Sequence, residues 1–142
     1  NIAKRQIKSP KIYVADSGLL HQLLNVETSH ELMGHGKVGA SWKGFALQQL
    51  TIRLGVSEHE RFFWALHTGA ELDLLIVRGR ERLGFEVKLT DSPKVTPSMH
   101  SALQALGLKR IDVLCRGEHV FSMGEQIRAV PVQFLWDPTL KF

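Results

Sequence analysis

Three short apolar segments follow one another at residues 62–66, 71–77 and 83–89. Each is rich in aromatic or branched side chains and is bounded by polar or glycine residues, a pattern typical of β-strands joined by tight turns. Apolar residues recur at helical spacing from Ser41 to about Leu54, before Gly55, and again over residues 95–107. Further extended segments follow at 110–115, at 119–122 and from 130. The order helix, three strands, helix, strand predicts an α/β fold in which helices flank a mixed central sheet.

Outside these segments, the sequence predicts one further helix, a loop and an amino-terminal linker. Asp16 or Ser17 could cap a helix that ends near Leu24, and residues 25–38 have the composition of a loop. Residues 1–11 carry four basic side chains, and we expect them to be a linker or the tail of an upstream element. The first residue is Asn1 rather than Met, which suggests a piece of a longer protein. With 142 residues in total, residues 12–142 are predicted to form a single domain.

Composition excludes several classes of protein. The single cysteine, Cys115, rules out an internal disulfide and a thiolate-cluster zinc site. No apolar run approaches the roughly 18 residues of a membrane helix, and no signal-peptide pattern opens the chain. We therefore expect a cytoplasmic domain with no membrane contact. The net charge of +4 favours a polyanionic partner such as a nucleic acid, and the oligomeric state is left open.

Charged residues lie on strands that are otherwise apolar. Side chains alternate between the two faces of a strand. Alternation therefore predicts that Asp73 shares a face with Leu75 and Val77, opposite Leu72, Leu74 and Ile76. By the same rule, Glu86 and Lys88 project opposite Phe85, Val87 and Leu89. If the two strands pair through the turn at residues 78–80, Asp73 and Glu86 lie close together.

Two hypotheses explain this cluster. In the first, Asp73, Glu86 and the carbonyl of Val87 hold Mg²⁺, with Mn²⁺ as a substitute, and Lys88 positions or activates a water that attacks a phosphodiester. In the second, the cluster is structural, and Lys88 neutralises Glu86 and Asp73. Arginines surround the nearby turn and are predicted to grip nucleic-acid phosphates, or else form a solvated basic turn; these are Arg78, Arg80 and Arg82.

The pattern of Asp73 followed by Glu86-Val87-Lys88 resembles the D…(D/E)xK signature of the PD-(D/E)XK nuclease superfamily. The predicted αβββαβ order agrees with the restriction-endonuclease-like core of that superfamily. Over roughly residues 8–90, the chain also resembles the C-terminal domain of unknown function of a bacterial and archaeal family of AAA-type ATPases. The segments that carry this second resemblance are residues 10–19, 39–50, 69–74 and 85–88.

The resemblance implies an upstream P-loop ATPase module as a partner in the full-length protein. The chain itself contains no Gly-x-x-x-x-Gly-Lys-Ser/Thr motif, so no ATP site of this kind is expected in it. Related domains often carry a Glu in the first core helix that completes the metal site. This chain has Lys43 at that position, and residues 39–55 contain no Asp or Glu.

Lys43 could pair with a carboxylate and occupy the place of a metal. Two functions are therefore open. One is Mg²⁺-dependent phosphodiester hydrolysis on DNA, or DNA binding, by a nuclease-like domain of an ATPase. The other is a catalytically degenerate module that binds DNA, another protein or its own ATPase.

Overall fold

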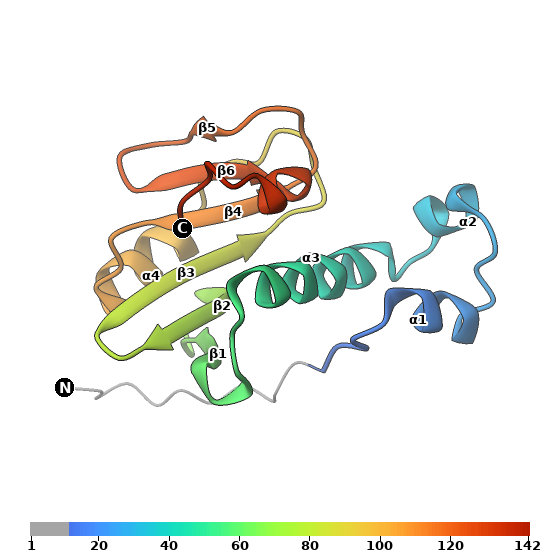
Figure 1. Ribbon diagram of the computed structural model, residues 1–142, viewed down its shortest axis with the longest axis horizontal. Helices are drawn as coiled ribbons and strands as arrows, with labels where there is room; N and C mark the ends of the chain where they lie inside the picture. The colour runs from blue at the N-terminus through green and yellow to red at the C-terminus, as the bar shows by residue number, and fades with distance from the viewer. Residues whose placement is uncertain (1–11) are drawn as a thin grey trace.

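The computed structural model describes residues 12–142. The predicted linker, residues 1–11, lies outside the described residues. Within this part of the chain, six strands form one mixed sheet in the order β1-β2-β3-β4-β6-β5 (Figure 1). The strands are β1 (Arg61–Ala65), β2 (Glu71–Arg78), β3 (Glu81–Val87), β4 (Ile111–Cys115), β5 (Phe121–Ser122) and β6 (Ile127–Pro131). The predicted mixed α/β architecture is confirmed.

The sheet combines an antiparallel half with a parallel half. β1, β2 and β3 form an antiparallel meander, β4 lies parallel to β3, and β6 lies parallel to β4. The chain crosses from β3 to β4 through α4 (Pro97–Leu106), as a parallel pair requires. The short β5 closes the far edge, antiparallel to β6.

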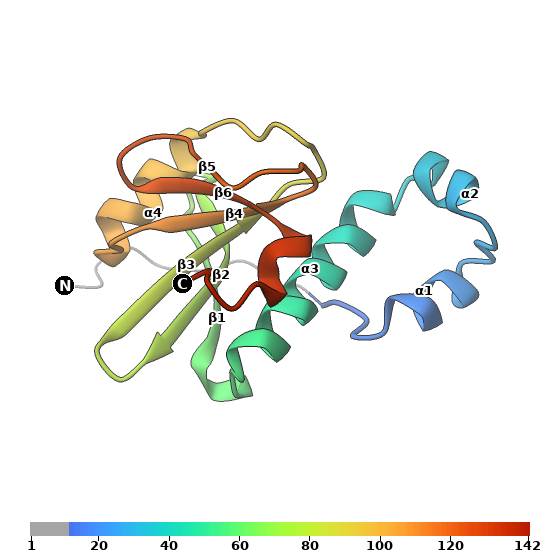
Figure 2. The same ribbon diagram turned by 45° about the horizontal axis from the view of Figure 1, so that its top comes forward.

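Helices cover both faces of the sheet (Figure 2). On one face, Ala46 and Leu50 of α3 (Val38–Leu54) pack with Leu74, Phe85 and Leu114 of the sheet. On the other face, a second cluster joins α4 to the sheet through Met99, Ala102, Leu103, Leu72, Ile111 and Val113. Both clusters are apolar and buried, so the hydrophobic effect fixes each helix on its face.

The amino-terminal helices lie beside the amino-terminal half of α3, away from the sheet (Figure 1). α1 (Ser17–Leu23) is capped by Asp16, as the sequence indicates, and His21 Nε2 lies 2.7 Å from Ser41 Oγ of α3. The expectation of a loop over 25–38 is wrong in part, because α2 (Ser29–Gly34) forms there. Its cause is a capping box, in which Thr28 and Glu31 satisfy each other's backbone N–H groups.

The predicted boundaries shift at several elements. α3 starts at Val38 rather than after Ser41, and the predicted strand at 119–122 shortens to Phe121–Ser122. The last extended segment begins at Ile127 rather than at residue 130 and passes directly into the 3-10 helix η2 (Val132–Trp136). A second such turn, η1 (Glu58–Glu60), precedes β1. None of the helices in residues 12–142 is long and apolar enough to cross a membrane.

Candidate functional site

A β-bulge in β2 determines where Asp73 points. The pairing of β1 with β2 shifts by one residue between Phe62 and Trp64, so Phe63 lies opposite two residues, Asp73 and Leu74. Such an extra residue interrupts the alternation of a strand, and bulges are frequent beside functional sites.

The bulge overturns the predicted placement of Asp73. Leu72 and Leu75 both belong to the cluster beneath α4, and Leu74 belongs to the cluster beneath α3. Asp73 contacts Lys43 of α3, so it lies on the α3 face with Leu74. Strict alternation had assigned it to the face of Leu75, and had grouped Leu72 with Leu74. Both assignments are wrong because the extra residue shifts the alternation by one position.

The paired carboxylates lie where β2 and β3 stop pairing. The register of the two strands ends at Leu74 opposite Phe85. Beyond it, the backbone N–H of Val87 donates to Asp73 Oδ2 over 3.0 Å, and the N–H of Asp73 donates to Glu86 Oε2 over 3.3 Å. The two carboxylates thus accept N–H groups that a continued ladder would have paired with carbonyls. The structure therefore brings Asp73 and Glu86 together.

Each of these acids also meets a lysine. Lys43 Nζ lies 2.6 Å from Asp73 Oδ1, and Lys88 Nζ lies 2.9 Å from Glu86 Oε1. The Asp73 side chain is fully buried and that of Glu86 is 5% exposed, whereas 23% of Lys43 and 36% of Lys88 reach the surface. A buried carboxylate is costly unless it is paired and hydrogen-bonded. We call Lys43, Asp73, Glu86 and Lys88 the ion-pair cluster.

Burial and neighbouring charges raise the pKa of two groups at the ion-pair cluster, Glu86 and Tyr13. Burial raises the pKa of Glu86, and the charge of Asp73 raises it further, while Lys88 and Lys43 oppose the shift. Burial, together with the charges of nearby carboxylates, also raises the pKa of Tyr13 to about 12. Tyr13 therefore stays a neutral phenol at physiological pH.

Tyr13 is a part of the site that sequence reasoning missed. Its ring packs against Gly44 of α3, where an added Cβ would lie 3.5 Å from the ring. Tyr13, Gln48, Arg61 and Asp73 are among the residues that line a cavity of about 390 Å³ beside the cluster. A small residue on a helix is a weak signal for such packing, and nothing in the sequence connects it with Tyr13.

The donor set does not fit a divalent metal in this arrangement. All four carboxylate oxygens of Asp73 and Glu86 accept from a nitrogen, and two of these nitrogens are ammonium groups. Among residues 12–142, no group of three or more His, Cys, Asp or Glu side chains could hold a metal ion. Mg²⁺ prefers oxygen ligands and retained waters. In place of a metal ion, the ammonium groups of Lys43 and Lys88 contact the carboxylate oxygens of Asp73 and Glu86.

The predicted phosphate-binding arginines lie at the opposite end of the hairpin. Arg82 is four residues from Glu86 along β3, which corresponds to roughly 13 Å at the usual rise of a strand. Arg82 donates to the carbonyl of Leu106, and Arg78 donates to Glu60 and to the carbonyls of Leu54 and Gly55. These two arginines thus bind the carboxyl ends of α4 and α3, where cations are favourable. Arg80 occupies the turn itself.

Comparison with known proteins places these residues in a family. The family model of DUF4143, a domain of unknown function, matches residues 38–135. This range contains the whole ion-pair cluster. The chain belongs to the DUF4143 family. The match begins at α3, so α1 and α2 precede the part of the domain that the family shares.

Two mycobacterial relatives of this DUF4143 domain are similar over almost its whole length. Uncharacterized proteins of Mycobacterium bovis and Mycobacterium tuberculosis are each 43% identical to it over 131 residues, or 92% of this chain. The chain spans 29% of the length of each relative. The relatives are therefore much longer proteins in which this domain is one part.

Proposed function

We propose that this DUF4143 domain is a catalytically degenerate PD-(D/E)XK-like module that serves a larger protein by binding rather than by hydrolysis. The observation that carries the proposal is the 2.6 Å contact between Lys43 Nζ and Asp73 Oδ1. A metal-dependent nuclease needs carboxylate oxygens that are available to a cation. Here a divalent ion would have to displace an ammonium group from a fully buried carboxylate.

The element order supports the nuclease-like part of the proposal. A helix, a three-strand meander, a crossover helix and a parallel strand follow one another as α3, β1–β3, α4 and β4. Asp73 and Glu86 occupy adjacent strands at the point where those strands separate. This is the arrangement that the PD-(D/E)XK resemblance implies, and fold similarity alone does not imply cleavage.

The larger protein is proposed to contain an AAA-type ATPase module. This part of the proposal rests on the resemblance of residues 8–90 and on the length of the mycobacterial relatives, of which the chain spans 29%. The domain would then act as the binding module of that ATPase, for DNA, for another protein or for the ATPase itself.

Mg²⁺-dependent phosphodiester hydrolysis is the second candidate function. It is favoured by the adjacency of Asp73 and Glu86 and by Lys88 beside Glu86. It requires Lys43 to leave Asp73, and the present donor set does not fit the metal. We therefore derive no catalytic step for this alternative.

Replacement of Asp73 by alanine separates the two functions. The ion-pair account predicts that Asp73→Ala lowers the free energy of unfolding by about 2–4 kcal/mol, because Lys43 and the N–H of Val87 both lose their acceptor. The measurement is urea denaturation with and without Mg²⁺ or Mn²⁺, and the metals are expected to leave the wild-type curve unchanged.

Asp91→Ala is the matched control for that substitution. The Asp91 side chain is 70% exposed and lies 3.5 Å from Arg116, so this surface pair should contribute no more than about 0.5 kcal/mol. Unchanged or raised stability in Asp73→Ala, or stabilisation of the wild type by either metal, would contradict the proposed function and support the nuclease.

A further inference from the structure

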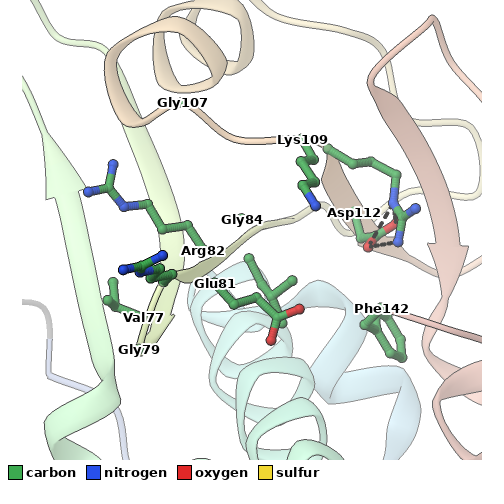
Figure 3. Close-up of a pocket in the computed structure, with 12 residues that line it drawn as sticks. Val77, Gly79, Glu81, Arg82, Gly84, Gly107, Lys109, Asp112 and Phe142 are labelled. Atoms are coloured by element: carbon green, nitrogen blue, oxygen red, sulfur yellow. Dashed lines mark hydrogen bonds and ion pairs between the residues drawn. The ribbon is translucent and has the colours of Figure 1, made fainter.

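A second hollow lies at the turn end of the β2–β3 hairpin, away from the ion-pair cluster. This hairpin-end cavity has a volume of about 790 Å³ (Figure 3). Its walls come from the hairpin turn, the start of β3 and the loop between α4 and β4. The charged side chains that line it are Arg80, Glu81, Arg82, Lys109, Arg110 and Asp112.

Three of these six charged side chains, Arg82, Arg110 and Asp112, already have partners within the protein. Asp112 lies 3.1 Å from Arg110 and 2.6 Å from Arg128, so two cations face one buried carboxylate. Arg82 donates to the carbonyl of Leu106 over 2.8 Å. The remaining acid, Glu81, is exposed at the rim, and Figure 3 shows its carboxylate on the side of Phe142.

Two cations of the cavity are left without such partners. Within residues 12–142, Arg80 and Lys109 are exposed and make no ion pair or side-chain hydrogen bond. Figure 3 shows the Lys109 side chain extending into the space between the hairpin and Asp112. Together with the excess positive charge around Asp112, these side chains give the cavity a cationic lining.

We propose that the hairpin-end cavity binds the phosphodiester backbone of a single-stranded nucleic acid. The proposal rests on the binding role proposed above and names its ligand. Cations contributed by two separate segments of the chain, the hairpin and the loop before β4, suit an extended polyanion better than one small anion, because a strand presents a negative charge at every nucleotide. The half-buried ring of Phe142 lines the same cavity, with the Arg128 guanidinium 5.9 Å from its centre, and the part of the ring that stays exposed offers an apolar contact for a base.

The turn that carries Arg80 has a defined geometry. Arg78 pairs with Glu81, so only Gly79 and Arg80 form the loop, and Gly79 has a φ of 61°. Glycine at the first position of a two-residue hairpin loop is typical of a type II′ turn. Arg80 therefore lies on a short, constrained loop rather than on a long mobile one.

Fluorescence anisotropy with a labelled oligothymidylate tests the proposal. The probe is titrated with the full chain at several salt concentrations in the presence of a chelator, which prevents any metal-dependent cleavage. Wild type is expected to bind with an affinity that falls as salt rises. The double variant Arg80→Ala/Lys109→Ala should bind about tenfold more weakly at low salt, with a shallower dependence on salt because about two phosphate contacts are lost.

The double variant Lys37→Ala/Lys94→Ala is the matched control. Both lysines are exposed and lie outside the cavity lining, and their loss changes the net charge by the same amount. It should weaken binding less than about twofold. No binding by the wild type, or an equal loss in both double variants, would overturn the proposal. Cavity-dependent binding of polyglutamate but not of the oligonucleotide would assign the surface to an acidic protein instead.

The two proposals can fail separately. Metal binding at Asp73 would overturn the non-catalytic role and leave the anisotropy result intact, since the chelator removes the metal. Loss of oligonucleotide binding would remove the ligand proposed here and leave the ion-pair cluster as described.

Discussion

Asp73 and Glu86 are neighbouring buried acids, but the hydrogen bonds that each accepts differ. Asp73 accepts from Lys43 and from the N–H of Val87. Glu86 accepts from Lys88 and from the N–H of Asp73 over the longer distance of 3.3 Å. Burial and the charge of Asp73 outweigh the lysines at Glu86, so its pKa is raised. The native state therefore disfavours the charged form of Glu86.

This difference predicts how stability depends on pH. Because the pKa of Glu86 is raised above the ordinary value of 4.5, its contribution to stability is complete below that value and is lost as the pH rises through the folded-state pKa. Replacing Glu86 by glutamine removes the titration. Glu86→Gln should match wild type near pH 4 and become the more stable protein towards pH 8, measured by urea denaturation across about that range.

Glu60→Gln provides a control of opposite sign. Hydrogen bonds from Arg78, and further ones from Ser57, lower the pKa of Glu60 to about 2. Its contribution is present above the ordinary pKa and is lost as the pH falls through the folded-state value, so Glu60→Gln should be less stable than wild type at neutral pH. A gap for Glu86→Gln that does not widen with rising pH would contradict the charge balance described for the cluster.

At the residue level, the sequence correctly predicted that Asp73 and Glu86 lie close together, but it assigned Asp73 to the wrong face of the sheet. The glycine turn was enough to bring Asp73 near Glu86. The face of Asp73 was wrong, because one extra residue in β2 is invisible to an alternation count. The sequence left open whether Lys43 pairs with a carboxylate, and in the structure it contacts Asp73. Which acid it meets depends on how α3 packs on the sheet.

At the scale of elements, β3 is the strand that connects the hairpin-end cavity with the ion-pair cluster. Its amino end borders the hairpin-end cavity and its carboxyl end carries Glu86. Arg78 and Arg82 flank the hairpin turn and bind the carboxyl ends of α3 and α4. The hairpin thus holds helices on opposite faces of the sheet, and phosphate binding by these two arginines stays a prediction.

Close packing of β3 against the α4 side predicts the effect of adding one methyl group. A Cβ at Gly84 would lie 2.5 Å from Leu108 Cδ1, closer than packed atoms allow. Gly84→Ala should therefore lower the free energy of unfolding by about 1–3 kcal/mol in urea denaturation. Gly124→Ala, where nothing lies within 4 Å of the added atom, is the control. Equal stability of the two variants would show that β3 is not packed as described.

Element prediction was most successful for long periodic segments. The three meander strands and the two sheet-covering helices were predicted close to their observed positions, because their apolar faces are determined by burial. α2 was missed because its stability is local: it has no buried residue and begins with the capping box of Thr28 and Glu31. The extent of β6 was also missed, since Ile127 and Arg128 become strand residues by pairing with β4, a contact distant in sequence.

At the scale of the whole molecule, two regions lie at opposite ends of one hairpin. The ion-pair cluster lies at one end, where the proposed nuclease-like fold would place a metal, and the hairpin-end cavity presents cations at the other. A net charge of +4 is consistent with a polyanionic partner. The prediction of one domain over 12–142 stays a prediction, as does the ATPase expected in the longer relatives.

Titration calorimetry of Mn²⁺ and Mg²⁺ into wild type and Asp73→Ala tests the central claim most directly. If Lys43 occupies the place of a metal at Asp73, neither protein will show saturable binding of either ion, and the two titrations will be the same. Saturable binding by the wild type that is lost in Asp73→Ala would contradict the account, because it would show that Asp73 binds the metal in spite of Lys43.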